Sequence, residues 1–250
     1  MCTMVILRRP GHLWPVLIAA NRDENGGRPW DPPGRHWADR PEVVAGRDRL
    51  ADGSWLGIND HGVVAGILNR RASLGPEAGK RSRGELVLEA LDHADAREAV
   101  RALAALDGAA YRPFNLVVAD NRDAAWVRHS GATRVEVLAI PTGLSMLTAG
   151  DLDDATSPRV RRYLPRFQTA AIPDPGAADW REWQSLMTST ERDPWESPRA
   201  AMNIVTDGPF GTVSSSLIAL PQPGTDLKPV WRFAAGRPGQ APYEDVPLGR

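Results

Sequence analysis

The sequence predicts an α+β fold in which antiparallel sheets are covered by helices. Short apolar runs bounded by Gly, Asn or Asp fill most of the first 150 residues and are typical of β-strands. One stretch of helical periodicity, residues 82–108, interrupts these runs, and two shorter helical segments and two late strands follow it. Strand pairs, a helical middle and further strands together favour an α+β sheet sandwich with helices covering the sheets.

The strands are predicted from apolar runs that end at turn-forming residues. Between Asn59 and Val63, the sequence Asp-His-Gly predicts a tight hairpin turn in which Gly62 takes a positive φ. The predicted strands are Thr3–Arg8, Pro15–Asn21, Glu42–Ala45, Trp55–Asn59, Val63–Leu68, Phe114–Ala119, Ala125–Arg128, Val135–Ala139, Gly143–Thr148, Thr212–Leu220 and Val230–Ala234.

Three segments are predicted to be helical. Leu86, Leu88, Leu91 and later apolar residues lie on one face of residues 82–108. Residues 157–167 begin with Ser157 as a cap and Pro158 at the first helical position. Residues 177–189 are expected to form the third helix. No linker divides the chain, so we expect one domain over residues 1–235. The Pro- and Gly-rich segment 236–250 is expected to be a disordered tail.

Composition excludes several classes of function. The net charge of −1, with 24% charged residues, gives no reason to expect nucleic acid as a partner. No segment is long and apolar enough to span a membrane, and Arg8 and Arg9 follow an apolar segment rather than precede one, unlike a signal peptide. The sequence therefore predicts a cytoplasmic protein. Its oligomeric state cannot be read from the chain.

Metal and redox chemistry are not expected from the residue types. The single cysteine, Cys2, excludes an intramolecular disulfide, and the five histidines are scattered without the spacing of metal ligands. No metal site is therefore predicted. The run Gly-Pro-Glu-Ala-Gly-Lys-Arg-Ser at residues 75–82 fails the spacing of a phosphate-binding loop and is interpreted as a basic, flexible loop.

The position of Cys2 suggests a different chemistry. Methionine aminopeptidase removes Met1 when the next residue is small, which would leave a thiol and an α-amine on one residue. The amine, with a pKa of about 8, can act as general base for the thiol, with a pKa of about 8.5. A cysteine at the second position also occurs by chance, so position alone does not establish a nucleophile.

A second feature strengthens that hypothesis. The apolar run ending at Ala20 leads directly into Asn21-Arg22-Asp23, and the strands on either side of residues 9–14 are expected to form an antiparallel hairpin. In every register Cys2 then lies across from a residue between Ala19 and Asp23. Asp23 could orient the amine or thiol, and Arg22 could steady developing negative charge.

The same three residues recur at Asn121-Arg122-Asp123, after another apolar run. This second copy has no nucleophile opposite it and lies between two predicted strands. It is therefore interpreted as a plain turn.

Several motifs, in order and with their spacing, resemble the NRDE family, also called the transport and Golgi organisation protein 2 family. They are Cys2-Thr3, NRDE at 21–24, RPW at 28–30, Trp37, GRD at 46–48, GSWLGIN at 53–59 and GILN at 66–69. The resemblance continues more loosely to about Ala234. It implies an Ntn-hydrolase-like αββα sandwich of two antiparallel sheets covered by helices. A wider similarity links the chain to bile salt hydrolases and penicillin V acylases.

The resemblance also implies roles for individual residues. Cys2 matches the nucleophile and amine base, Asp23 its orienting carboxylate, Arg22 a neighbouring cation, and Asn69 an oxyanion-hole or substrate-side amide. Two positions depart from the pattern, because Ala149 stands where Asn is usual and Val213 where Arg is common. Loss of one oxyanion donor typically lowers the rate about a hundredfold to a thousandfold.

Two functions are therefore carried forward. The first is a possible N-terminal cysteine amidohydrolase that cleaves a non-peptide acyl-amide bond of a small amphipathic or acyl substrate and needs no cofactor. The second, implied by the family resemblance, is a haem- or lipid-binding trafficking protein on a weakened hydrolase scaffold. Neither a Cys-Pro motif nor a prominent histidine points to haem.

Overall fold

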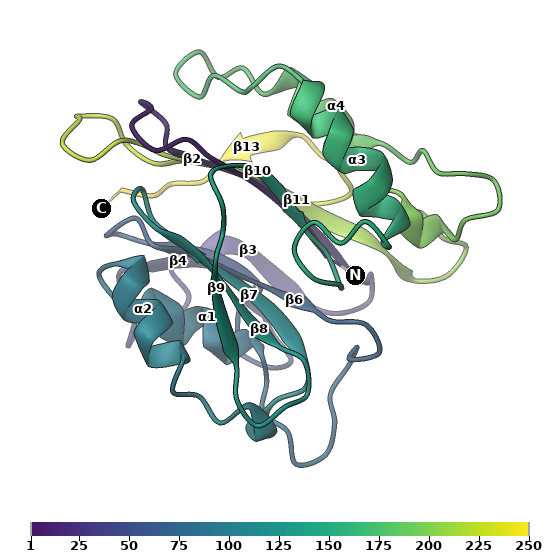
Figure 1. Ribbon diagram of the computed structural model, residues 1–250, viewed down its shortest axis with the longest axis horizontal. Coiled ribbons are helices and arrows are strands. Elements are labelled where there is room, and N and C mark those ends of the chain that lie inside the picture. Colours follow the sequence, from purple (N-terminus) through teal and green to yellow (C-terminus); the bar gives the residue numbers. More distant parts are fainter. Residues whose placement is uncertain (1, 250) are drawn as a thin grey trace. The chain divides into compact units, whose positions relative to one another are not determined.

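A computed structural model describes residues 2–249, and within them the chain divides into two compact units. The first unit runs to Arg28 and resumes over Pro141–Val246, and the second comprises Pro29–Ile140 with the C-terminal residues from Pro247. Each unit holds one antiparallel sheet and two α-helices (Figure 1). The predicted α+β class with two antiparallel sheets is confirmed.

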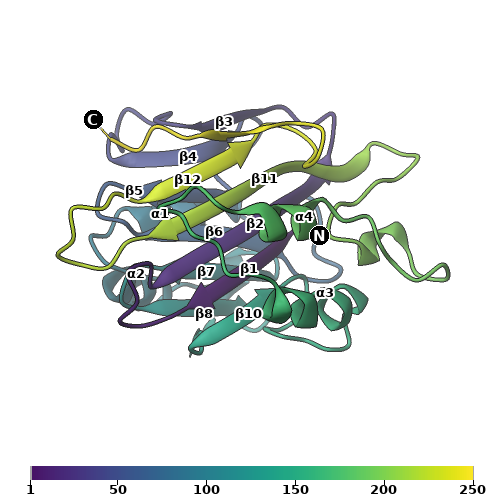
Figure 2. The ribbon, with the colours of Figure 1, turned by 90° about the horizontal axis from the view of Figure 1, so that it is seen from above.

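The first unit is built on a six-stranded sheet whose order is β10-β1-β2-β11-β12-β13. Figure 2 shows β10, β1, β2, β11 and β12 side by side in this order. The strands are β1 (Thr3–Arg8), β2 (Val16–Asn25), β10 (Gly143–Leu147), β11 (Phe210–Leu220), β12 (Val230–Ala234) and β13 (Tyr243–Asp245). The N-terminal hairpin is thus in the middle of the sheet, with strands from the far end of the chain beside it.

Helices α3 (Pro158–Thr169) and α4 (Arg181–Thr188) cover one face of this sheet, and the short 3-10 helix η2 (Pro198–Ala200) follows them. Their contact is an apolar core in which Tyr163, Phe167 and Trp183 from the helices meet Leu17 and Ala19 from β2. Since side chains alternate along a strand, the odd-numbered residues of β2 point toward the helices.

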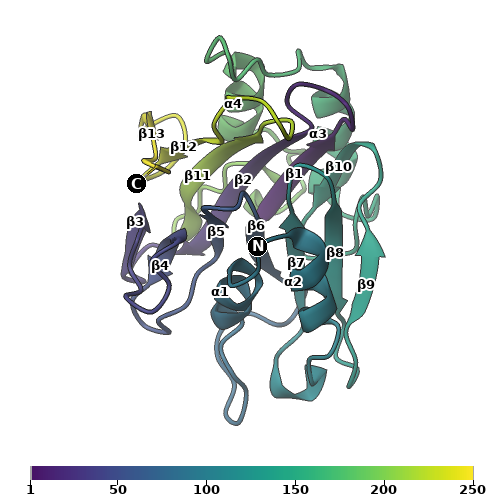
Figure 3. The same cartoon turned by 90° about the vertical axis from the view of Figure 1, so that its left-hand side faces the viewer.

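The second unit is built on a seven-stranded sheet whose order is β3-β4-β5-β6-β7-β8-β9. Its helices, α1 (Gly84–Leu91) and α2 (Ala96–Leu103), pack on one face, and Figure 3 shows them beside β6, β7 and β8. The strands are β3 (Trp30–Gly34), β4 (Val43–Asp48), β5 (Leu56–Asn59), β6 (Val64–Asn69), β7 (Phe114–Ala119), β8 (Ala124–His129) and β9 (Glu136–Ala139). A 3-10 turn, η1 (Gly108–Ala110), precedes β7.

Every strand that the sequence predicts is present. β1, β7 and β12 have the predicted bounds, the other predicted strands have shifted ends, and β3 and β13 are additional strands. Strand β3 was not predicted because it contains Pro32 and Pro33, and proline cannot donate a hydrogen bond to a neighbouring strand. It accommodates them because it lies at the edge of its sheet.

The predicted helical stretch 82–108 is two helices. The helix is interrupted because Asp95 is the N-cap of α2. Its side chain accepts a 2.8 Å hydrogen bond from the N–H of Glu98 in the first turn of α2.

The segment from Gly236 was expected to be disordered, and its described part is instead ordered. Strand β13 extends the first sheet by pairing with β12. The hydroxyl of Tyr243 donates a 2.7 Å bond to Oγ of Ser215, and the backbone carbonyl of Pro238 accepts one from Asn203. Composition does not reveal this order, because it depends on a sheet edge supplied by β12. The single-domain expectation for residues 1–235 stays a prediction.

The glycines of two family motifs are explained by close packing. A Cβ on Gly46, in GRD, would lie 2.2 Å from the ring of Trp55, and one on Gly53, in GSWLGIN, would lie 2.6 Å from the backbone of Gly84. A Cβ atom does not approach a non-bonded heavy atom this closely, so a side chain at Gly46 would displace the Trp55 ring and one at Gly53 would displace the backbone of Gly84. These motif residues therefore shape the second unit.

Within residues 2–249, no helix has the length and apolarity that crossing a membrane requires. In the same described residues, no group of three or more His, Cys, Asp or Glu side chains is arranged to hold a metal ion.

Candidate active site

The β1–β2 hairpin brings the N-terminal residues to the Asn-Arg-Asp motif. Thr3 pairs with Asn21, and the hairpin loop is closed by a 2.7 Å bond from the N–H of Arg9 to the carbonyl of Pro15. Cys2 comes directly before Thr3, so continuing this register sets it opposite Arg22, inside the range that the sequence predicts. Met1, whose removal the hypothesis requires, lies outside the described residues.

The motif itself lies inside β2 and not beyond its end. Alternation along the strand therefore sends Asn21 and Asp23 to the helix-covered face and Arg22 to the opposite face. Asn21 has a structural role there: its amide donates to the backbone carbonyls of Met187 and Met202, at 3.0 and 2.9 Å. These bonds tie β2 to the end of α4 and to the segment after η2.

Asp23 is buried, and both of its carboxylate oxygens are engaged. Oδ1 accepts a 2.6 Å hydrogen bond from the hydroxyl of Thr212, which in turn accepts the N–H of Ile204 at 2.8 Å. Oδ2 accepts a 3.0 Å bond from Nη1 of Arg159, forming an ion pair in which the side chains are 0% and 3% exposed. The predicted carboxylate is thus held from β11 and from α3 at once.

Arg159 and Thr212 were not singled out by sequence reasoning. They are 136 and 189 residues from Asp23 along the chain, so no local pattern joins them to it. Arg159 did carry one signal. It lies in the first turn of α3, where the positive end of the helix dipole disfavours a cation, and an arginine there calls for a compensating anion.

The Cys2 thiol lies beside the backbone of Asp23. Its Sγ is 3.9 Å from the Asp23 carbonyl oxygen, within the range of a weak S–H···O bond. Burial raises the pKa of the Cys2 thiol, and the negative charge of Asp23 raises it further, while the amino terminus and Arg22 act in the opposite direction. A thiol with a raised pKa is mostly protonated near neutral pH, so attack would require a base.

Arg22 is nearly fully buried, with 5% of its surface exposed, and pairs across the sheet with Ser214. The ladder between β2 and β11 is irregular at this point, because Val213 is an extra residue between the pairs Thr212–Asp23 and Ser214–Arg22. A bulge of this kind redirects a side chain and is frequent beside active sites. The apolar Val213 therefore lies in the bulge next to the motif.

Ala149, the other departure from the family pattern, lies on the opposite side of the hairpin. Strand β10 pairs with β1 through Met4 and Leu147, so continuing that register by two residues sets Ala149 beside Cys2. Ala149 is buried, with 3% of its surface exposed. Its methyl group cannot donate a hydrogen bond to an oxyanion.

The second copy of the motif is a turn, as predicted. Oδ1 of Asp120 accepts the N–H groups of Arg122 and Asp123, both at 2.7 Å, and closes the connection between β7 and β8. The carboxylate of Asp123 meets Arg97 at 3.3 Å on the surface. The two copies have the same residues, but the first is buried within β2 and the second is in a turn at the surface.

Asn69 is the last residue of β6, in the second unit, where it is half-buried and pairs with Phe114. The next residue, Arg70, which was considered for an anionic substrate, donates to the side chain of Asn115 at 2.7 Å. The role of Asn69 stays a prediction.

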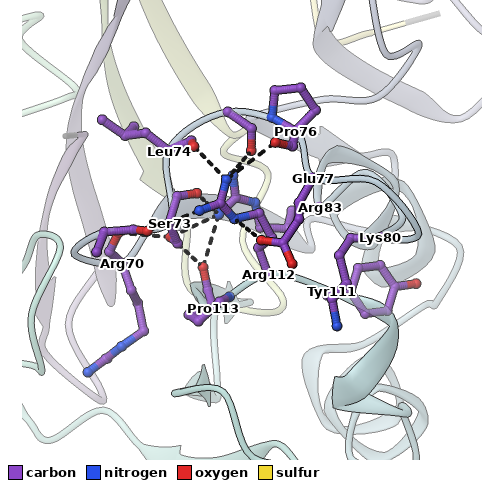
Figure 4. Close-up of polar contacts among 12 residues, drawn as sticks. Arg70, Ser73, Leu74, Pro76, Glu77, Lys80, Arg83, Tyr111, Arg112 and Pro113 are labelled. Carbon is purple, nitrogen blue, oxygen red and sulfur yellow. Dashed lines mark hydrogen bonds and ion pairs between the residues drawn. The ribbon is translucent and has the colours of Figure 1, made fainter.

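The loop that follows Asn69 is pinned by two arginines and is not a loose basic segment (Figure 4). Arg112 donates to the carbonyls of Leu74 and Ala72, at 2.7 and 3.0 Å, and Arg83 donates to those of Ser73 and Pro113, at 2.8 and 3.0 Å. The side chains of these two arginines thus bond backbone carbonyls of the loop that are not paired with a neighbouring strand.

Comparison with solved structures identifies the fold. A Caenorhabditis elegans orthologue of N-acylethanolamine-hydrolyzing acid amidase aligns with a TM-score of 0.61 at 13% identity, covering 89% of this chain and 94% of that one. The C2A mutant of conjugated bile acid hydrolase from Clostridium perfringens aligns with a TM-score of 0.56 at 14% identity, covering 98% and 92%. The chain therefore has the Ntn-hydrolase-like fold that the sequence predicts.

The family follows from sequence. The model of the Transport and Golgi organisation 2 family matches residues 1–225, and the chain belongs to this family. Curated relatives are the Transport and Golgi organization protein 2 homologs of Bos taurus, 35% identical over 111 residues, and of Homo sapiens, 34% identical over 110 residues. Each match covers 42% of this chain and spans only 38% of the relative's length.

Proposed function

We propose that this protein is an N-terminal-nucleophile hydrolase of acyl-amide bonds, with Cys2 as the nucleophile after removal of Met1. The observation that carries the proposal is the hairpin register, which brings the only cysteine to within 3.9 Å of the backbone of Asp23. Asp23 is buried, its carboxylate accepts two side-chain hydrogen bonds, and the adjacent Arg22 is also buried. Burying two charged residues in succession is energetically unfavourable for a strand with a purely structural role.

The proposed reaction uses the α-amine and thiol of one residue. The amine takes the thiol proton, directly or through water, and the sulfur attacks the carbonyl carbon of the substrate. The resulting tetrahedral oxyanion collapses to a thioester as the C–N bond breaks, and the leaving amine receives the proton held by the α-amine. Water then attacks the thioester, releasing the acid and restoring the thiol.

One side chain is assigned to charge in this reaction. Arg22 provides positive charge beside Cys2. Since neither Ala149 nor Val213 can donate from its side chain, we expect turnover to be about a hundredfold to a thousandfold below that of an enzyme with a complete oxyanion hole.

The proposed substrate class rests on the names of the two structural neighbours. The names of the two structural neighbours describe hydrolysis of an N-acylethanolamine and of a conjugated bile acid. The first name describes an acyl group joined to a small polar amine, and we therefore propose N-acyl amides with an amphipathic acyl group as the substrates of this chain.

The first test compares Cys2 with and without a residue ahead of it. With an N-terminal tag in place, the raised pKa of the thiol should make alkylation by iodoacetamide slow at pH 7 and faster as the pH is raised. Removal of the tag to expose Cys2 should accelerate alkylation at pH 7 at least about tenfold, because the α-amine accepts the proton. The measurement is intact mass against time at several pH values.

Two results would contradict the proposal. One is native protein that retains Met1, since the amine then belongs to another residue. The other is equal alkylation rates for the tagged and exposed forms at every pH.

The haem- or lipid-binding alternative stays a prediction from the family resemblance. A saturable change in haem absorbance on titration with the protein would support it, and the absence of such a change would count against the haem form of the alternative.

A further inference from the structure

Arg159 occupies a position that is unfavourable for an arginine. It lies in the first turn of α3, near the positive end of the helix dipole, and its side chain is 3% exposed. Moving a guanidinium out of water is unfavourable unless partners compensate for its lost hydration. Its neighbours on the helix, Val160, Tyr163 and Phe167, belong to the apolar core, so an apolar residue would suit the same surroundings.

The side chain of Arg159 connects α3 to three other elements, β1, β2 and η2. Nη1 donates to the hydroxyl of Thr3, the residue after Cys2, and to Oδ2 of Asp23 at 3.0 Å. Nη2 donates to the backbone carbonyl of Arg199, in η2, at 2.8 Å. The guanidinium of Arg159 thus bonds both the start of β1 and the end of β2 and fixes the position of one relative to the other.

Stability alone does not account for this pair. A buried ion pair is often no more stabilising than apolar residues of similar volume, because both ions lose their hydration. What the pair does provide is orientation. Thr212 bonds one carboxylate oxygen of Asp23 and Arg159 bonds the other, so the carboxylate is restrained against rotation.

We propose that Arg159 is a positioning residue for the Cys2 site. It acts through Asp23 and Thr3, and it sets where Cys2 lies relative to the Arg22-Asp23 segment. This inference rests on the proposed function and deepens it by adding a residue from α3. A guanidinium can bond Thr3, Asp23 and Arg199 at once because its nitrogens form a rigid fork; a lysine ammonium keeps the charge and loses part of that geometry.

The test compares three variants with the wild-type protein, all with Cys2 exposed. Arg159→Met removes the charge and the fork, and Arg159→Lys keeps the charge. Arg166→Met is the matched control, because Arg166 is on the same helix and pairs with Glu191 at 2.5 Å at the surface. The measurements are the rate of Cys2 alkylation at pH 7, the melting temperature, and kcat and KM for an N-acyl amide.

We expect Arg159→Met to lower the alkylation rate and kcat at least about tenfold with KM little changed, because a displacement of about 1 Å can cost a hundredfold in rate. Arg159→Lys should recover most of that loss, and Arg166→Met should match the wild type. A folded Arg159→Met protein with wild-type alkylation and kcat would overturn the proposal.

Two provisions keep the test decisive. If Arg159→Met does not fold, the test uses Thr3→Val in its place. This substitution removes the hydroxyl that accepts a hydrogen bond from Arg159 and keeps the shape of the side chain. Slower alkylation of Cys2 in this variant supports the proposal, and an unchanged rate overturns it. Alkylation does not require turnover. If the wild type hydrolyses no acyl amide, the proposed function fails, while the alkylation rates still decide whether Arg159 positions Cys2.

Discussion

Replacing Cys2 by alanine is expected to lower acyl-amide hydrolysis about a thousandfold or more, to the background rate. Removal of a nucleophile eliminates the covalent route, and what remains is catalysis by binding and by the surrounding charges. The measurement is release of free amine from a set of N-acyl amides, together with the intact mass of acid-quenched protein. Wild-type protein should show a mass increase equal to the acyl group, and the alanine variant should not.

Cys2→Ser is the matched variant for this experiment. Serine is also small, so Met1 should still be removed, and the α-amine remains in place beside a poorer nucleophile. We expect a slow but measurable rate that exceeds that of the alanine variant. Hydrolysis at the wild-type rate by Cys2→Ala, with Met1 removed, would show that the nucleophile lies elsewhere.

Replacing Asp23 by asparagine is expected to lower the free energy of unfolding of the protein by about 3–5 kcal/mol. The shape of the side chain is kept, but Arg159 loses its anion while its side chain is only 3% exposed. An arginine cannot lose its proton to escape this penalty. The measurement is urea unfolding followed by circular dichroism, with the slope checked for two-state behaviour.

The second copy of the motif supplies the control. Asp123 occupies the same place in Asn-Arg-Asp, but its ion pair with Arg97 is at the surface, with the two side chains 47% and 71% exposed. Asp123→Asn should therefore change stability by no more than about 0.5 kcal/mol. Equal losses for the two variants would mean that burial of the Asp23–Arg159 pair has no energetic consequence.

Arg159→Met should destabilise the protein less than Asp23→Asn does. The Met side chain fills the space of the guanidinium with apolar atoms, and Thr212 still donates to the carboxylate of Asp23, whereas Asp23→Asn leaves the buried charge of Arg159 without its anion. The order of the two melting temperatures therefore reports which member of the pair is more costly to leave without its partner.

The sequence predicts the strands and the hairpin because their determinants are local. Apolar runs define β1 and β2, and consecutive strands usually pair, so the amino-acid pattern alone leads us to expect Cys2 and Asp23 as neighbours. Where local signals mislead, the physical reason is identifiable. Asp95 restarts a helix within a continuous apolar periodicity, and two prolines conceal the edge strand β3.

The surroundings of the motif are decided by the tertiary structure. By itself the sequence determined that a lone cysteine near the N-terminus lies across a hairpin from Asn21-Arg22-Asp23. Only the folded chain decided that Asp23 is locked by Thr212 and Arg159, and that Asn121-Arg122-Asp123 stays at the surface. The reason is that burial and ion pairing depend on residues that are distant along the chain. The residue types within a short motif do not indicate which other residues pack against it.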